Sequence, residues 1–280
     1  MTLTTLLLPL DDDPLCELRT QFTLSLARAH ASHVIGLACG GTVDLPVDAA
    51  GATSLSEYAD VAWSAIRERN ERCAGAFRIA CASTPPVSFE TISEESERAQ
   101  AIVRRSHCAD LVVLSQPNPS LPNDAAYRRM IEEVLLNGPR PTLLLPYAGH
   151  FKSSPRNVMV ACNDSREGAR ALADALPLLR KSDQVQLVAW MEGDDDRSLL
   201  RSELDTVARW LGRHHVQATA RVELLSGIGI ADAMLSRAAD LGAELIVMGA
   251  YGHARWSERI LGGATRGILA TMTVPVFMSH

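Results

Sequence analysis

The chain has 280 residues, of which 47% are hydrophobic and 21% charged, and its formal net charge is −6. This composition is that of a folded globular protein and excludes a disordered chain. The lack of a basic excess argues against a protein that binds DNA or RNA directly. The length suits one large domain or two of ordinary size.

The six cysteines and the first ten residues indicate the cellular compartment. The cysteines form no Cys-x-x-Cys pair and have no metal-ligand spacing with histidine, so we expect buried free thiols and no metal site. The stretch Met1–Leu10 lacks a basic region, and its apolar run stops at Asp11, which is too short for a signal peptide or a membrane span. We expect a cytoplasmic protein without a membrane partner.

Apolar strands and amphipathic helices alternate along the first half of the chain. The strands that we expect there are Thr5–Leu10, His33–Ala38, Val87–Ile92, Asp110–Ser115 and Thr142–Pro146. The helices that we expect between them are Leu15–Ala31, Ser56–Ala74, Glu94–His107 and Ala125–Leu136.

The second half repeats this order. Its expected strands are Asn157–Cys162, Gln184–Trp190, Ala218–Leu225, Glu244–Met248 and Val274–Met278. After a helix cap at Asn163–Ser165, one helix carries its apolar residues through Leu179, and the later helices are Asp196–His214, Ile230–Leu241 and Gly262–Ala270. One order of elements in both halves indicates duplication and fusion.

Strands separated by helices predict βαβ crossovers. We therefore expect an α/β protein of two tandem flavodoxin-like or Rossmann-like domains, each a five-stranded parallel sheet with helices on both faces. The expected domains are residues 1–149 and 156–280, with residues 150–155 as the linker.

The most informative motif follows the fourth strand of the second half. Ile246–Gly249 runs through Gly252 to Gly262 and a helix start. Glycine permits close approach of the backbone, and the free N–H groups at a helix start attract anions, so a phosphorylated ligand is the first hypothesis. In isolation such spacings also occur in ordinary turns between a strand and a loop.

The spacing Gly249-x2-Gly252-x9-Gly262 resembles the nucleotide-binding signature of the universal stress protein family, and two domains of that type account for nearly the whole chain. Two positions depart from the family pattern. Gly263 stands where the family has Ser or Thr, and Asn163 stands where it has an Asp that contacts adenine. Thr265 offers a nearby hydroxyl, and the Asn163 amide can still meet a base edge.

The resemblance implies ATP or another adenine nucleotide as a regulatory ligand in the second domain, with Mg²⁺ as an optional companion. It also implies pairing of the last strands of the two halves as an internal pseudo-dimer, and a homodimer of whole chains. The residues expected at the ligand are Asn163, Val188, Gly249, Gly252, His253, Arg255, Gly262, Gly263, Ala264 and Thr265.

The first half has lost this motif. Ser115 and Asn118 replace the two loop glycines, and Arg128 and Arg129 stand in the positions of Gly262 and Gly263. Arginine fills the space that a phosphate needs, although Asp11 retains the acidic residue of the family. We expect no nucleotide of the family kind in the first half.

No set of side chains predicts catalysis. The chain contains no Walker A sequence. For His253, an exposed loop residue that contacts phosphate or water is favoured over a role in phosphate transfer, and Arg255 fits either a phosphate contact or an exposed loop charge. Three functions stay open: a nucleotide-binding stress-response protein, a nucleotide-free interaction scaffold, and slow ATP hydrolysis assisted by His253, which is the weakest of the three. Protein partners are not indicated.

Overall fold

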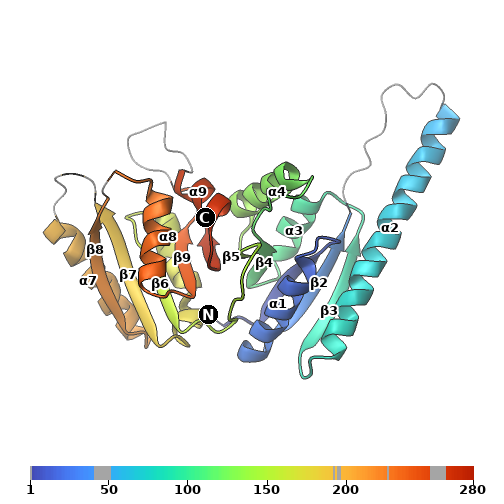
Figure 1. Cartoon of the computed structure of the whole chain (residues 1–280). Coiled ribbons are helices and arrows are strands. Elements are labelled where there is room, and N and C mark those ends of the chain that lie inside the picture. The colour runs from blue at the N-terminus through green and yellow to red at the C-terminus, as the bar shows by residue number, and fades with distance from the viewer. Residues whose placement is uncertain (1, 41–51, 192, 194–196, 226, 253–262) are drawn as a thin grey trace.

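The computed structural model describes residues 2–40, 52–191, 193, 197–225, 227–252 and 263–280 (Figure 1). In this part of the chain, strands and helices alternate through both halves, as the sequence predicts. The α/β fold class is confirmed.

The first half contains five strands and four helices in its described residues. The strands are β1 (Thr5–Leu10), β2 (His33–Cys39), β3 (Ser88–Glu94), β4 (Leu111–Ser115) and β5 (Thr142–Leu145). The helices are α1 (Cys16–His30), α2 (Ala52–Ala82), α3 (Arg98–Ser106) and α4 (Asp124–Asn137).

The second half has the same strand order. Its strands are β6 (Asn157–Ala161), β7 (Gln184–Met191), β8 (Ala218–Leu224), β9 (Leu245–Gly249) and β10 (Val276–Ser279). Its described helices are α5 (Arg166–Asp174), α6 (Leu176–Leu179), α7 (Arg197–Arg213), α8 (Ile230–Asp240) and α9 (Gly263–Thr271).

All the strands belong to one sheet. The order is β3-β2-β1-β4-β5-β10-β9-β6-β7-β8, so the second half mirrors the first about the β5–β10 junction. Pairs within each half are parallel, and β5 and β10 pair antiparallel with Leu143 opposite Phe277. The two halves therefore join through their last strands, as the family resemblance implies.

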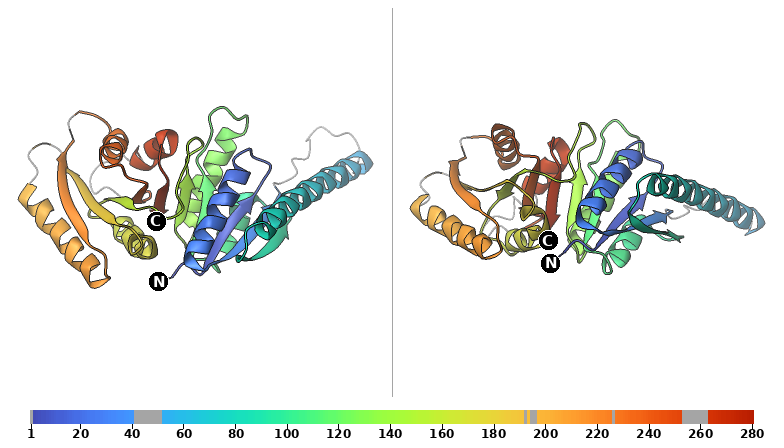
Figure 2. Two further views of the ribbon diagram at one scale, coloured as in Figure 1. Left: turned by 60° about the horizontal axis from the view of Figure 1, so that its bottom comes forward. Right: turned by 90° about the horizontal axis from the view of Figure 1, so that it is seen from below.

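Helices cover both faces of the sheet (Figure 2). An apolar layer lies between the helices and the sheet on each face. The first layer contains the buried side chains of α1, α2, α5, α6 and α7, and the second contains those of α3, α4, α8 and α9. Because strand side chains alternate between faces, Val160 of β6 belongs to the first layer and Met159 to the second. Both layers continue across the β5–β10 junction.

Polar contacts also cross between the halves. The Gln116 side chain, 1% exposed, donates to the carbonyl of Leu269 at 3.1 Å and accepts from the backbone N–H of Tyr147 at 3.2 Å. Arg170 donates to the carbonyl of Pro139 at 2.6 Å. The Gln116 bonds satisfy a buried polar side chain where the halves meet, and the Arg170 bond adds an exposed contact there.

Three helices differ from the sequence expectation. The helix expected to run through Leu179 is broken at Ala175, and Pro177 lies in the first turn of α6 because proline cannot donate to the preceding turn. The helix α3 begins only at Arg98, since Glu94 still belongs to β3 and Glu97 is the N-cap. The helix α2 is longer than expected and extends beyond the sheet (Figures 1 and 2).

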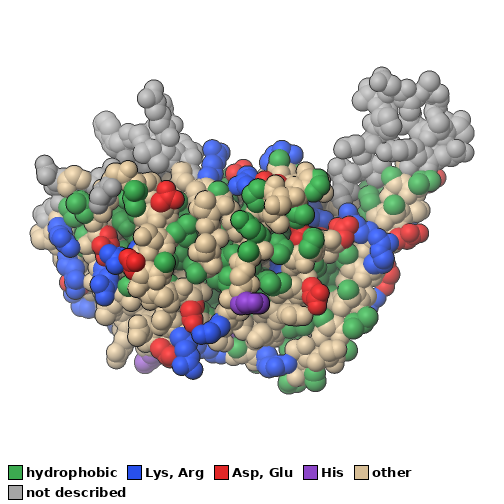
Figure 3. Space-filling view, in the orientation of Figure 1, with side chains coloured by type: hydrophobic (Ala, Val, Ile, Leu, Met, Phe, Trp, Pro, Cys, Tyr) green, Lys and Arg blue, Asp and Glu red, His purple; other side chains and the backbone are tan. Residues whose placement is uncertain are grey.

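The cysteines are all free thiols, as expected, but only Cys39 and Cys81 are fully buried, and Cys108 is exposed. Burial raises the pKa of the Cys39 and Cys81 thiols to about 11. Among the described helices, none combines the length and the apolar character that a membrane crossing requires. Acidic and basic side chains are interspersed over the face of the molecule in Figure 3.

Protonation of His30, which lies near the second half, should lower the stability of the folded protein in acid. Burial, and next to it the charge of Lys181, lowers the pKa of His30 to about 4. As pH falls below 6.5, the unfolded chain binds this proton first, so the folded state loses stability between pH 6.5 and 4. Since His30 is partly exposed, we expect a loss of about 1 kcal/mol.

Urea unfolding at pH 7.5 and pH 5 measures this effect. The variant His30→Gln should show a smaller drop in unfolding free energy between the two pH values than the parent protein. Equal drops in the two proteins would contradict the assignment to His30.

Candidate functional site

A candidate site lies at the carboxyl ends of the strands in the second half. There a cavity of about 810 Å³ opens between the loop after β6, the end of β9 and the first turn of α9. The strands β6 and β9 are neighbours, and the chain leaves them toward opposite faces of the sheet. Crevices at such positions are the usual ligand sites of open α/β sheets.

Six of the predicted ligand residues line this cavity. They are Asn163, Gly249, Gly252, Gly263, Ala264 and Thr265. The described residues of α9 begin at Gly263, beside this cavity. His253, Arg255 and Gly262 lie outside the described residues.

Gly249 is required by the packing of α5 against β9. A Cβ atom there would lie 2.6 Å from the backbone N of Gly168 and 2.8 Å from the carbonyl carbon of Glu167. Backbone atoms cannot yield as a flexible side chain can, so a larger residue would push α5 away from the sheet. This glycine thus shapes the cavity wall.

Val188 lies deeper than expected. It is fully buried within β7, and its carbonyl accepts a hydrogen bond from the N–H of Cys162 at 2.8 Å. The strand continues to Met191, and Trp190, two residues further on the same face, lines the cavity instead.

The N-terminus of α5 fixes the Asn163 side chain. Ser165 caps the helix by accepting from the N–H of Gly168 at 2.9 Å, which confirms the predicted cap. The Ser165 hydroxyl then donates to Oδ1 of Asn163 at 2.8 Å. The acceptor of Asn163 is thereby engaged, and its amide NH₂ is the group left to donate.

Thr265 contacts the loop as well as the cavity. Its hydroxyl oxygen accepts from the backbone N–H of Tyr251 at 3.1 Å, and the residue is 2% exposed. Tyr251 has φ of 51°, a left-handed conformation that is uncommon for a residue with a side chain. The hydroxyl that was expected to meet phosphate therefore also holds the glycine loop in this turn.

Glu167 is a functional candidate that sequence reasoning missed. Its carboxylate lines the cavity, with Oε2 lying 3.1 Å from where a Cβ atom on Gly252 would be. Burial raises the pKa of Glu167, but its own backbone N–H and Arg166 outweigh this and bring the pKa below its usual value. The cavity lining therefore contains an ionised Glu167 carboxylate at neutral pH, paired with the Arg166 guanidinium at 3.1 Å.

The missed lining residues also include Trp190, Tyr251, Ile230 and Met234. Glu167 follows the cap residue Ser165 by two positions, so its place in the first turn of α5 was the available signal. The strand alternation that puts Trp190 on the face of Val188 was the signal for the aromatic wall.

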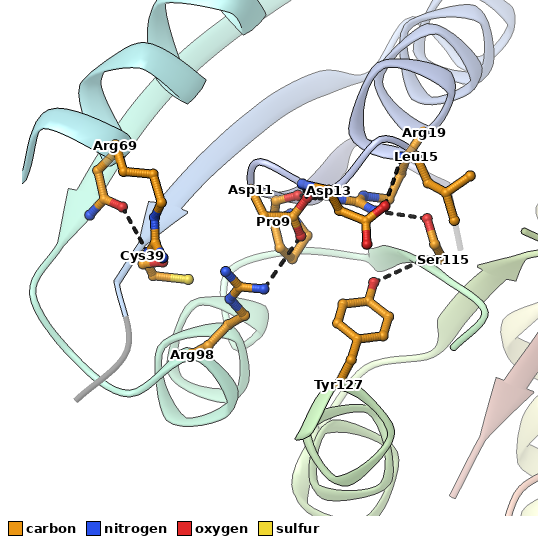
Figure 4. A network of polar contacts seen from close by, with 11 residues as sticks. Pro9, Asp11, Asp13, Leu15, Arg19, Cys39, Arg69, Arg98, Ser115 and Tyr127 are labelled. Carbon is orange, nitrogen blue, oxygen red and sulfur yellow. Dashed lines mark hydrogen bonds and ion pairs between the residues drawn. The ribbon is translucent and has the colours of Figure 1, made fainter. Parts of the chain in front are cut away.

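The corresponding crevice of the first half is filled by protein side chains (Figure 4). Arg19 is fully buried and donates to the Ser115 hydroxyl at 2.8 Å, to the Pro9 carbonyl at 3.1 Å and to Asp11 at 2.9 Å. Arg98 lies 3.5 Å from the other carboxylate oxygen of Asp11. Asp11 is thus occupied within the protein.

Tyr127 of α4 completes this arrangement. Its hydroxyl oxygen accepts from the backbone N–H of Ser115 at 3.3 Å (Figure 4). Burial would lower the pKa of Arg19, but the Asp11 carboxylate outweighs it and raises the pKa above its usual value. A permanently charged guanidinium therefore stands between the ends of β1 and β4.

The comparison with solved structures decides the fold. A universal stress protein from Archaeoglobus fulgidus DSM 4304 aligns over 99% of this chain and 96% of its own, with a TM-score of 0.70 and 18% identity. The chain has the tandem universal stress protein fold. A functionally unknown protein from Pseudomonas aeruginosa PAO1 shares that fold over 99% of this chain and 92% of its own, at a TM-score of 0.58 and 15% identity.

The similarity between this chain and the solved universal stress proteins lies in the structure. No protein-family model matches the chain, and the comparison with curated proteins finds no relative. Identities of 15% and 18% leave individual site residues to be judged from their own geometry.

Proposed function

We propose that the chain is a stress-response protein of the universal stress type that binds an adenine nucleotide, ATP or a relative of it, as a regulatory ligand in the second half. The observation that carries this proposal is the cavity of about 810 Å³ lined by Asn163, Gly249, Gly252 and the first turn of α9. Its volume falls in the range of small-molecule and cofactor sites.

The chemistry of the walls suits the two ends of a nucleotide. Trp190, Ile230 and Met234 offer an apolar and aromatic surface for a purine ring. The backbone of Gly263 and Ala264, together with Gly252, which has no side chain, lines the same cavity and suits phosphate oxygens if a helix start lies there. The Asn163 NH₂ group can donate to a ring nitrogen.

Mg²⁺ would bind together with the nucleotide phosphates. No three His, Cys, Asp or Glu side chains gather as a metal-ligand set within the described ranges. The cavity lining does include the carboxylates of Asp164 and Glu167, which suit a hard cation.

We further propose one nucleotide per chain. At the ends of β1 and β4 in the first half, Arg19 donates hydrogen bonds to Asp11 and Ser115. The cavity of the second half lies at the corresponding ends of β6 and β9. This supports the expectation from the sequence that the first half does not take the ligand.

A nucleotide-free interaction scaffold is the second candidate, and Glu167 favours it. A buried carboxylate beside Gly252 opposes an approaching phosphate by like-charge repulsion. The proposed homodimer belongs with either function, and sedimentation of the purified chain at several concentrations tests it.

The variant Gly252→Val tests the nucleotide proposal. Its side chain would meet Glu167 and Ser165 and fill the cavity entrance, so we expect ATP affinity to fall at least tenfold. Small molecules released from the denatured protein would be identified by mass spectrometry, and ATP binding to the emptied protein would be measured by calorimetry.

The matched control is Gly212→Val on α7, where an added Cβ atom meets nothing within 4 Å. It should bind ATP as the parent protein does. Absence of adenine nucleotide from the released material, together with no binding of added ATP by the parent protein, would reject the proposal in favour of the scaffold.

A further inference from the structure

A second cavity, of about 500 Å³, lies on the other side of the β6–α5 loop. Its floor is formed by Val160 of β6 and Ala189 of β7, and its sides by α5 and α7. Both floor residues belong to the apolar layer of α1, α2, α5, α6 and α7. The nucleotide cavity is bordered instead by Trp190, Met234 and Met248, which belong to the opposite layer. The two cavities therefore lie on opposite faces of the sheet.

The interior of this second cavity is apolar. Leu172 of α5 and Leu204, Val207 and Trp210 of α7 form its walls. Leu204 is 3% exposed, whereas Val207 and Trp210 are only half-buried although they belong to the same helix face. The helix α7 therefore packs tightly against the core at Leu204. At Val207 and Trp210 it leaves apolar surface that faces the cavity.

Two carboxylates and one guanidinium lie at the mouth of the cavity, where Arg209 donates to the hydroxyl of the lining residue Thr206 at 2.8 Å. Glu203 and Asp164 belong to its lining and are exposed, and neither forms an ion pair in the described part of the chain. Arg166, the nearest cation along the sequence, pairs with Glu167 at 3.1 Å. Two carboxylates at the rim of an apolar cleft favour a cation at that position.

We propose that this cavity is a second ligand site, for a small molecule that combines an apolar body with one positively charged amine. The apolar body would contact Leu172, Leu204 and Val207, and the Trp210 ring adds a face that attracts cations. The amine would lie at the rim near Glu203 and Asp164. The volume of the cavity suits a body of one aromatic ring with a short chain.

Three probes with one apolar body test the charge preference. They are 3-phenylpropylamine, 3-phenylpropanol and 3-phenylpropanoate, which carry a positive, no and a negative charge at neutral pH. Titration calorimetry on the full chain should give the amine a dissociation constant about tenfold below that of the alcohol, and the acid should bind weakest. No binding of the amine, or an amine that binds no better than the alcohol, would overturn the proposal.

Two variants locate the site. Ala169→Phe places a ring in the cavity from an exposed position of α5 and should abolish amine binding. The matched control is Ala239→Phe at an exposed position of α8, which should bind the amine as the parent does. Unchanged binding to the folded Ala169→Phe protein would place the amine elsewhere and reject the assignment.

A milder variant keeps the test valid if Ala169→Phe fails to fold. Glu203→Gln removes one rim charge and should reduce the preference for the amine over the alcohol at least threefold. The control Glu133→Gln makes the same change on α4 and should leave that ratio unchanged. Equal ratios in the two variants would reject a role for the rim carboxylates.

Discussion

Replacing Asp11 with alanine should destabilise the protein by about 3–5 kcal/mol, because it leaves a buried guanidinium without its carboxylate. The side chain of Arg19 is fully buried, and that of Asp11 is 3% exposed. After the replacement, Arg19 retains only the neutral oxygens of Ser115 and Pro9. Arg98 also loses its carboxylate neighbour. Equilibrium unfolding in urea measures the loss.

Two controls separate charge from packing. In the double variant Asp11→Ala with Arg19→Met, the buried guanidinium is removed together with its carboxylate, so stability should recover in part relative to Asp11→Ala alone. Arg67→Met breaks the exposed pair with Glu95 and should cost less than 1 kcal/mol. A loss below 1 kcal/mol for Asp11→Ala would show that water or another side chain compensates Arg19.

Replacing Glu167 with glutamine should strengthen the binding of a phosphorylated nucleotide by about thirtyfold. The Glu167 carboxylate lies beside Gly252 in the proposed phosphate pocket, and its lowered pKa keeps it charged at neutral pH. A like charge about 5 Å away at an effective dielectric constant near 20 costs about 3 kcal/mol, of which we expect about 2 kcal/mol to be recovered. Calorimetric titration with ADP in the presence of a chelator measures the gain.

Adenosine provides the internal control, because without phosphate its affinity should change less than twofold. Glu68→Gln, the same change at an exposed position of α2, should leave ADP binding unaltered. Titrations with ADP in the presence of Mg²⁺ test whether Glu167 also binds the cation. If Glu167 holds the cation between itself and the phosphates, the glutamine variant should lose affinity in Mg²⁺ and gain it in chelator. Unchanged ADP affinity under both conditions would contradict a phosphate near Glu167.

The fold could be predicted from the sequence because its signals are local. Apolar strands such as Leu111–Ser115 and Leu245–Gly249 stand between amphipathic helices, and this alternation specifies a parallel sheet. The errors lie at helix ends. The break before α6 depends on Pro177, and Glu94 pairs into the edge of the sheet although acidic residues usually favour a helix start.

The candidate site could be predicted only in its backbone parts. Glycines at Gly249 and Gly252 and the cap at Ser165 have a local meaning that the sequence reveals. The side chains of Arg19 and Glu167 act through partners brought together by the fold, such as Ser115, which is 96 positions away from Arg19. No periodicity within one helix encodes such contacts. The sequence therefore predicts that the crevice of the first half does not bind the nucleotide, but it does not predict that Arg19 fills it.

The antiparallel pairing of β5 with β10 changes how the sheet depends on protein concentration. Two separate domains would hold these strands together only above the dissociation constant of their complex, and dilution would part them. Here residues 146–156 link the two halves that contain these strands, so their encounter is a first-order event with a high effective concentration. The ten-stranded sheet therefore persists at any dilution at which the chain itself stays folded.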